Sequence, residues 1–150
     1  MTHDELISTV NNLIETCKDG AEGFKTCSED ASDPHLKEEL ATRAESCASA
    51  ARELQDLVVA LGGKPAVSPS LSGTLHRRWI DIKAAILGKD DEAILNERER
   101  GEDVAVRSYR RALEKTLPPE VSAIIERQYH GVLQNHDAVK QMRDQLHAHH

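Results

Sequence analysis

The chain has 150 residues, of which 39% are hydrophobic, 30% are charged and only 3% are aromatic. A core with so few aromatic side chains relies on Leu, Ile, Val and Ala, which fill the seams between helices, so the composition favours helices over sheets. The length suits a single domain over residues 1–150. The formal net charge of −7 repels phosphate backbones, so the composition argues against nucleic acid as a partner.

The sequence gives no sign of membrane insertion. No apolar run approaches the roughly 20 residues that a spanning helix needs, and residues 1–5 contain no basic segment that leads into an apolar stretch. We therefore expect a cytoplasmic protein without a membrane partner. Cys17, Cys27 and Cys47 are odd in number and form no C-x-x-C pair, so we expect free, mostly buried thiols rather than disulfides.

Two long helices are predicted in the first part of the chain. Thr2 begins a capping box, and apolar residues then recur at helical spacing over residues 2–31. Asp33 can be the N-cap of the second helix, and the proline that follows it is favoured as the first helical residue. The glycine pair and proline in residues 62–65 end this helix.

Two further long helices are predicted in the second half. Asp90 or Asp91 can cap a helix that stops before Pro118, where two prolines follow each other. From Val121 to the chain end, core positions alternate in steps of four and three, the clearest heptad pattern in the sequence. An apolar stripe also predicts a shorter helix over residues 71–87.

The lengths of the connections indicate the topology. Short connections join the first two long helices and the last two, so each pair must form an antiparallel hairpin. The connection between the hairpins, residues 62–90, is long enough to traverse the bundle, as in ferritin-like folds. We therefore predict an all-α, ferritin-like antiparallel four-helix bundle with a long crossover that contains a short extra helix.

Fragments of a metal site occur in this pattern. Ferritin-like di-metal sites need a Glu from each of two helices and a Glu-x-x-His from each of the other two, but the sequence contains no Glu-x-x-His. Glu102 lies on the apolar stripe of the third long helix, and His136 flanks the seam of the fourth. Asp19 and Glu22, which have glycine neighbours, are the acids of the first helix that could turn inward to join them.

Polar residues at core positions have a second interpretation. Gln128 and Asn135 occupy core heptad positions, where a hydrogen-bonded layer commonly fixes the register of the helices. We weigh this structural role above a metal or catalytic cluster. In a metal-free bundle, Glu102 and His136 should form hydrogen bonds with each other or with Tyr109, Gln128 and Asn135.

Four segments of the chain carry a family resemblance. They are residues 13–24, 75–79, 99–109 and 126–137, which include an Asp-Gly-x-x-Gly-Phe motif and an Arg-Gly-Glu-Asp motif. Together they resemble an uncharacterised bacterial family of four-helix bundles, a domain of unknown function that is placed in the ferritin-like superfamily. The resemblance implies the same fold that the connection lengths predict.

The wider superfamily includes rubrerythrin-like di-iron proteins, in which a Gly-Glu pair on the third helix is followed by Tyr seven residues later. Gly101, Glu102 and Tyr109 resemble this pattern. His136 resembles the His of the fourth-helix Glu-x-x-His, but Leu133 stands where the Glu should be. The resemblance therefore implies a remnant of a di-iron site rather than a complete one.

The sequence favours a non-catalytic helical-bundle protein that forms a homo-oligomer and has a role in interaction or in the stress response. We expect no cofactor, and the sequence does not identify a protein partner. The alternative is a metal-binding, di-iron-like bundle in which Glu102, His136, Asp19 and Glu22 hold iron or another divalent metal. A third hypothesis is a carrier of a small ligand in the bundle core. We expect the His-rich end, residues 147–150, to bind metal only adventitiously.

Overall fold

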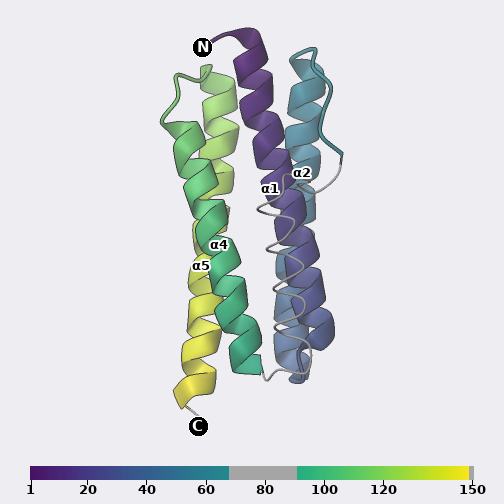
Figure 1. Ribbon diagram of the computed structural model, residues 1–150, viewed down its shortest axis with the longest axis vertical. Helices are drawn as coiled ribbons and strands as arrows, with labels where there is room; N and C mark the ends of the chain where they lie inside the picture. The colour runs from purple at the N-terminus through teal and green to yellow at the C-terminus, as the bar shows by residue number, and fades with distance from the viewer. Residues whose placement is uncertain (68–90, 149–150) are drawn as a thin grey trace.

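The computed structural model describes residues 1–67 and 91–148 (Figure 1). Its helices are α1 (His3–Asp30), α2 (Pro34–Ala60), α4 (Asp91–Leu113) and α5 (Pro119–Ala148). The described part contains no strand, and none of its helices combines the length and apolar character that crossing a bilayer requires. The all-α class and the four long helices are confirmed. The short helix predicted over residues 71–87 lies outside the described residues.

The predicted helix ends are confirmed at α1 and α2. The hydroxyl of Thr2 accepts a hydrogen bond from the Glu5 N–H at 3.1 Å, which caps α1. The carboxylate of Asp33 accepts one from the Leu36 N–H at 3.2 Å and caps α2 in the same way. Beyond α2, Gly62 has a φ of 82°, in the left-handed region that favours glycine, so the helix stops there.

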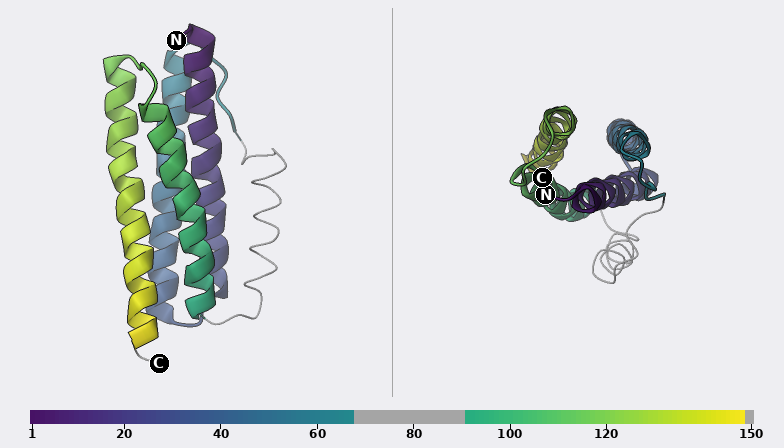
Figure 2. Two further views of the ribbon diagram at one scale, coloured as in Figure 1. Left: turned by 60° about the vertical axis from the view of Figure 1, so that its left-hand side comes forward. Right: turned by 90° about the horizontal axis from the view of Figure 1, so that it is seen from above.

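The helices lie along an arc in the order α2, α1, α4, α5 (Figure 2). α1 and α2 form one antiparallel hairpin, and α4 and α5 form the other. α2 and α4 run in the same direction (Figure 1), so α2 ends at the opposite end of the bundle from the start of α4. The connection between these two helices must therefore join opposite ends of the bundle.

Side chains of α1 and α2 hold the segment that follows α2. The amide of Asn11 donates to the Lys64 carbonyl at 3.1 Å, and its oxygen accepts from the Ala66 N–H at 2.8 Å. Gln55 donates to the Ala66 carbonyl at 2.9 Å. These backbone groups lie outside any helix and would otherwise need water as a partner. The bonds to Asn11 and Gln55 therefore hold the segment against the first hairpin.

Two hydrophobic clusters make up the core, one toward each end of the bundle. The first combines buried residues of all four helices: Leu6, Val10, Leu13, Ile14, Cys17, Ala51, Leu54, Val58, Tyr109, Ala112, Val121 and Ile125. The second does the same with Phe24, Cys27, Ala31, Leu36, Leu40, Ile94, Leu95 and Val139. The three cysteines are free, as predicted.

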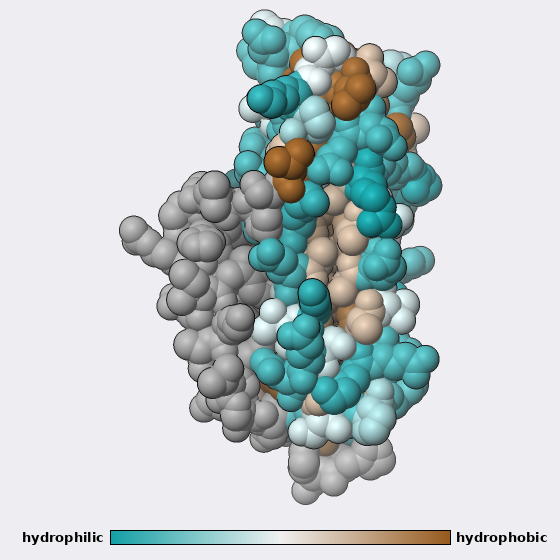
Figure 3. Space-filling model, turned by 90° about the vertical axis from the view of Figure 1, so that its right-hand side faces the viewer, coloured by the Kyte–Doolittle hydropathy of each residue, from teal (hydrophilic) through white to brown (hydrophobic). Residues whose placement is uncertain are grey.

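The outer surface is largely hydrophilic on the side shown in Figure 3, where a pale-brown band of moderately hydrophobic residues runs between hydrophilic margins. The large hydrophobic residues found exposed in the described part are Met1, Val59 and Val67. Most large aliphatic side chains elsewhere in this part pack in or against the two clusters, where burial stabilises the fold by about 25 cal/mol per Å² of apolar surface.

A test of this architecture concerns Asp91, the first residue of α4. Its carboxylate accepts hydrogen bonds from the backbone N–H groups of Ser32 at 2.8 Å and Asp33 at 3.1 Å, so it joins α4 to the turn between α1 and α2. Asp91→Ala should lower the free energy of unfolding by about 1 to 2 kcal/mol, because two N–H groups lose a charged acceptor. Urea denaturation followed by circular dichroism measures the loss. Asp56→Ala, at an exposed position of α2, is the control and should change stability little; equal effects would contradict the link.

Candidate functional site

A belt of buried polar residues separates the two hydrophobic clusters. Its most buried members come from α1, α4 and α5: Asp19, Arg98, Glu102, Gln128 and Asn135. A buried polar group costs free energy unless it is hydrogen-bonded, and a buried charge costs more unless it is paired. The contacts made inside this belt therefore decide whether the bundle centre is a site or a structural layer.

A chain of hydrogen bonds in the belt joins one residue from each helix. The Tyr109 hydroxyl on α4 lies 2.9 Å from the Cys17 sulfur on α1 and donates to the Gln128 side-chain oxygen on α5 at 2.8 Å. The amide of Gln128 donates to Glu53 on α2 at 2.7 Å. Glu53 in turn pairs with Arg127 at the surface. The predicted hydrogen-bonded layer is thus confirmed at Gln128.

Burial keeps the interior members of this chain neutral. It raises the pKa of the Cys17 thiol to about 11, although the hydrogen bond to Tyr109 opposes the rise. Burial likewise raises the pKa of Cys47 and the pKa of the Tyr109 hydroxyl. Because the thiolate is the reactive form of cysteine, both thiols are poor nucleophiles at neutral pH. The tyrosine proton goes to Gln128, so the Cys17 thiol donates to the tyrosine oxygen.

Glu102 pairs with a residue of its own helix. The Arg98 Nη2 atom lies 3.2 Å from Glu102 Oε1, and the two side chains are only 2% and 3% exposed. The guanidinium carbon stands 4.5 Å from the centre of the Phe24 ring, a cation–π contact. A side chain at position 101 would collide with this guanidinium, so Gly101 is needed for the arginine to fold back. Arg98 thus places a positive charge beside the buried Glu102 carboxylate.

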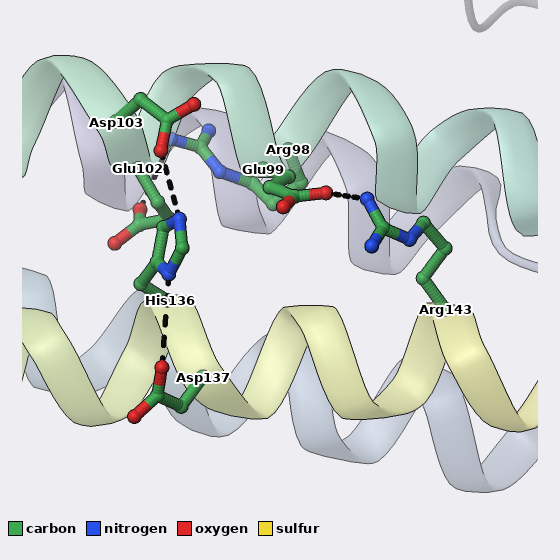
Figure 4. A network of polar contacts seen from close by, with 7 residues as sticks. All are labelled: Arg98, Glu99, Glu102, Asp103, His136, Asp137 and Arg143. Carbon is green, nitrogen blue, oxygen red and sulfur yellow. Dashed lines mark hydrogen bonds and ion pairs between the residues drawn. The ribbon is translucent and has the colours of Figure 1, made fainter.

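His136 turns toward exposed acids. Its Nε2 atom lies 2.8 Å from Asp103 Oδ1, and its Nδ1 atom lies 3.8 Å from Asp137 Oδ1. Figure 4 shows the ring between these two carboxylates and beside Glu102, with Glu99 and Arg143 paired farther along the same two helices.

The sequence-based prediction named the wrong hydrogen-bond partners for Glu102 and His136. Glu102 does not bond to His136 but to Arg98, because spacing of four residues places Arg98 and Glu102 on the same face of α4. His136 sits at the edge of the seam, from which it reaches Asp103 on the outer side of α4. Asn135 does take part in the layer, since it accepts a hydrogen bond from Arg43 at 3.3 Å.

The four residues predicted as metal ligands are placed differently from one another. Asp19 and Glu102 are buried, His136 is half-buried, and Glu22 is exposed. Glu22 does not turn inward, because Gly20, Gly23 and Phe24 fill the inner arc of α1. Within residues 1–67 and 91–148, no group of three or more His, Cys, Asp or Glu side chains is placed to hold a metal ion.

The bundle is open between α2 and α5, the two ends of the arc seen from above in Figure 2. A groove of about 750 Å³ lies there. Its lining includes Cys17, Arg43, Cys47, Ala50, Glu53, Tyr109, Arg127, Gln128, Gly131, Val132 and Asn135. Sequence reasoning did not find this groove; the signal for it was the run of small residues over positions 46–51 of α2, which keeps that side of the helix thin.

The sequence matches the family described as Domain of unknown function (DUF2383) over residues 5–115, and the chain belongs to this family. No match to a curated protein was found. The matched range contains α1 and α2, with Cys17 and Cys47, and extends past Glu102 and Tyr109 of α4. It ends before α5, so the α5 side of the groove lies outside the match. The resemblance to a domain of unknown function is confirmed.

The hydrogen-bond chain can be tested at Tyr109. Tyr109→Phe should lower the free energy of unfolding by about 1 to 3 kcal/mol, because the buried oxygen of Gln128 and the Cys17 thiol both lose their partner. Tyr129→Phe is a matched control, since the bond that the Tyr129 hydroxyl accepts from Arg110 at 3.3 Å is exposed to solvent. Urea denaturation of both variants gives the comparison. Losses of equal size would show that the chain contributes nothing special to stability.

The Glu102 carboxyl predicts a pH dependence. Burial raises its pKa above the ordinary 4.5, against the lowering effect of Arg98. A raised pKa in the folded state favours folding below the unfolded pKa, and this contribution is lost as the pH rises through the folded value. The stability of the parent protein relative to Glu102→Gln should therefore fall as the pH rises from about 4.5.

Urea denaturation of the parent and of Glu102→Gln between pH 4 and pH 8 measures this difference. Titrating groups that do not interact with Glu102 cancel in the comparison, whereas His136 and Asp103, which interact with its charge, contribute to the difference. Glu126→Gln, at an exposed position of α5, should show no such trend. A parent protein that gains stability over Glu102→Gln with rising pH would mean that Arg98 outweighs burial.

Proposed function

We propose that the protein is a non-catalytic helical bundle that acts by binding, with the groove between α2 and α5 as its working surface. The observation that carries this proposal is the contrast between the belt and the groove. In the belt, Glu102 is paired with Arg98 and the thiols are held neutral by burial, so the geometry supports neither a nucleophile nor an open metal position. The groove, by contrast, leaves polar side chains beside an accessible space.

The arrangement of the helices supports a ferritin-like bundle. Ferritin-like folds consist of two antiparallel hairpins joined by one long crossover. The parallel directions of α2 and α4, and the antiparallel neighbours α1 and α4, agree with that topology (Figure 1). In this proposal, Glu102 and His136 stand at former ligand positions, and Arg98 has replaced the charge of the metal.

The metal-binding bundle is the second candidate, because Figure 4 places the His136 ring beside the Glu102 carboxylate. Elemental analysis of a full-length variant in which His147, His149 and His150 are replaced by Ala distinguishes the two. We expect no iron, manganese or zinc in proportion to protein, whereas stoichiometric metal that is lost in Glu102→Ala would establish the second candidate and refute ours.

A fragment screen by two-dimensional nitrogen–proton NMR tests binding directly. We expect the amide shifts caused by binding fragments to cluster on residues 42–53 of α2 and 127–135 of α5. Shifts scattered over the surface, or confined to the outer face of α1, would show that the groove is not a binding surface. The proposal also includes a homo-oligomer and an interaction or stress-associated role. Light scattering in the same buffer tests the homo-oligomer.

A further inference from the structure

The groove is closed by side chains at two levels. On one level, Glu53 of α2 contacts Gln128 and Arg127 of α5. On the other, Arg43 of α2 donates to the Asn135 side-chain oxygen of α5 at 3.3 Å. About seven to ten helical residues separate the levels, which corresponds to roughly 10 to 15 Å along the helices. The groove is therefore a bounded window rather than an open channel.

The window is lined by small apolar side chains together with the polar residues Thr42, Ser46, Ser49 and Gln134. A Cβ atom built on Gly131 would meet nothing within 4 Å, so this half-buried position of α5 faces open space. Cys47, Ala50 and Val132 line the same space, and Cys17 and Tyr109 lie deeper. The thiols are uncharged because burial raises the pKa of each. A short hydrocarbon chain fits such walls, since it replaces water at small apolar surfaces.

The charges around the window favour an anion. Its lining has three arginines, Arg43, Arg52 and Arg127, against the two acids Glu45 and Glu53, which leaves one positive charge locally in a chain of net charge −7. Arg52 pairs with Glu45 at 3.2 Å, and Arg127 pairs with Glu53. Within the lining, the positive charge without an acidic partner is that of Arg43, which Glu39 outside the lining partly offsets at 3.9 Å.

The guanidinium of Arg43 has donors to spare. One terminal nitrogen bonds to Asn135, and the other is 3.9 Å from Glu39, too far for a strong hydrogen bond. Its Nε atom is buried and has no hydrogen-bond partner within residues 1–67 and 91–148. A buried N–H without an acceptor costs free energy, and a planar guanidinium binds a carboxylate through two parallel bonds. A carboxylate in the window would bond to the terminal nitrogens of Arg43, a residue that lines the groove, and not to the buried Nε atom.

We infer that the window between α2 and α5 is a binding site for a small organic carboxylate, held by Arg43 and with its short apolar body against Cys47, Ala50 and Val132. The groove volume of about 750 Å³ lies within the usual range for small-molecule sites. This inference rests on the proposed function, because it names the chemical class of ligand that the groove takes.

Titration of the full-length protein with hexanoate, followed by calorimetry and by nitrogen–proton NMR, tests the inference. We expect saturable binding of one hexanoate per chain and at least about tenfold weaker binding of hexanol, which lacks the charge. Arg43→Gln should weaken hexanoate binding by a similar factor, and Arg43→Lys should weaken it less because the charge stays. Arg52→Gln is the matched control, since Arg52 lines the same groove but is paired with Glu45, and its effect should stay below about twofold.

A second variant separates loss of binding from loss of folding. Gly131→Leu should block hexanoate while the melting temperature stays the same or rises, because the added side chain enters open space and leucine favours helix. Gly131→Ala, which leaves most of the window free, should still bind.

Several outcomes would overturn the inference. They are equal affinity for hexanol and hexanoate, equal weakening by Arg43→Gln and Arg52→Gln, unchanged binding in Gly131→Leu, and no hexanoate binding at millimolar concentration. If uncharged fragments still shift groove amides in that last case, only the ligand class is wrong. If no fragment does, the proposed function fails as well. Dissociation of an oligomer by Gly131→Leu without hexanoate binding would identify the window as an interface between copies of the chain.

Discussion

The hydrogen-bond chain from Cys17 through Tyr109 and Gln128 to Glu53 is the interaction on which the rest of the bundle depends. The two hydrophobic clusters hold the helices together, but apolar burial has no direction and tolerates sliding of one helix along another. A chain of directional bonds with one residue from each helix does not. The hydrogen-bond chain thereby fixes the position of α2 along α5, and with it the place where Arg43 meets Asn135 and where the groove lies.

Charge compensation explains the centre of the bundle in the same physical terms. A carboxylate as buried as that of Glu102 requires a nearby cation or a proton. The structure provides Arg98, whose fit depends on a glycine at position 101 and on the face of Phe24. Arg98 and Gly101 lie on α4, and Phe24 lies on α1. The space that Arg98 needs explains why position 101 is a glycine, although helix propensity alone would select a larger residue.

The open side between α2 and α5 follows from the size of the side chains that face it in the described part of the chain. Small residues on α2 and Gly131 on α5 leave too little volume to close the seam, so polar side chains bridge it at two levels instead. The thiols behind the window stay protonated because the same burial that removes water penalises the thiolate. A neutral floor and a cationic edge are what an amphipathic anion needs.

The sequence by itself determined the helix ends at Thr2, Asp33 and Gly62, the four long helices, and the polar layer at Gln128. These features depend on capping bonds between neighbouring residues and on a repeat along one helix. Both can be read from a short stretch of the sequence. Only the tertiary structure decided that Glu102 pairs with Arg98, that Glu22 faces solvent and that a groove opens beside Arg43. Such outcomes depend on the relative height and rotation of neighbouring helices, which are set by contacts between residues far apart in the chain.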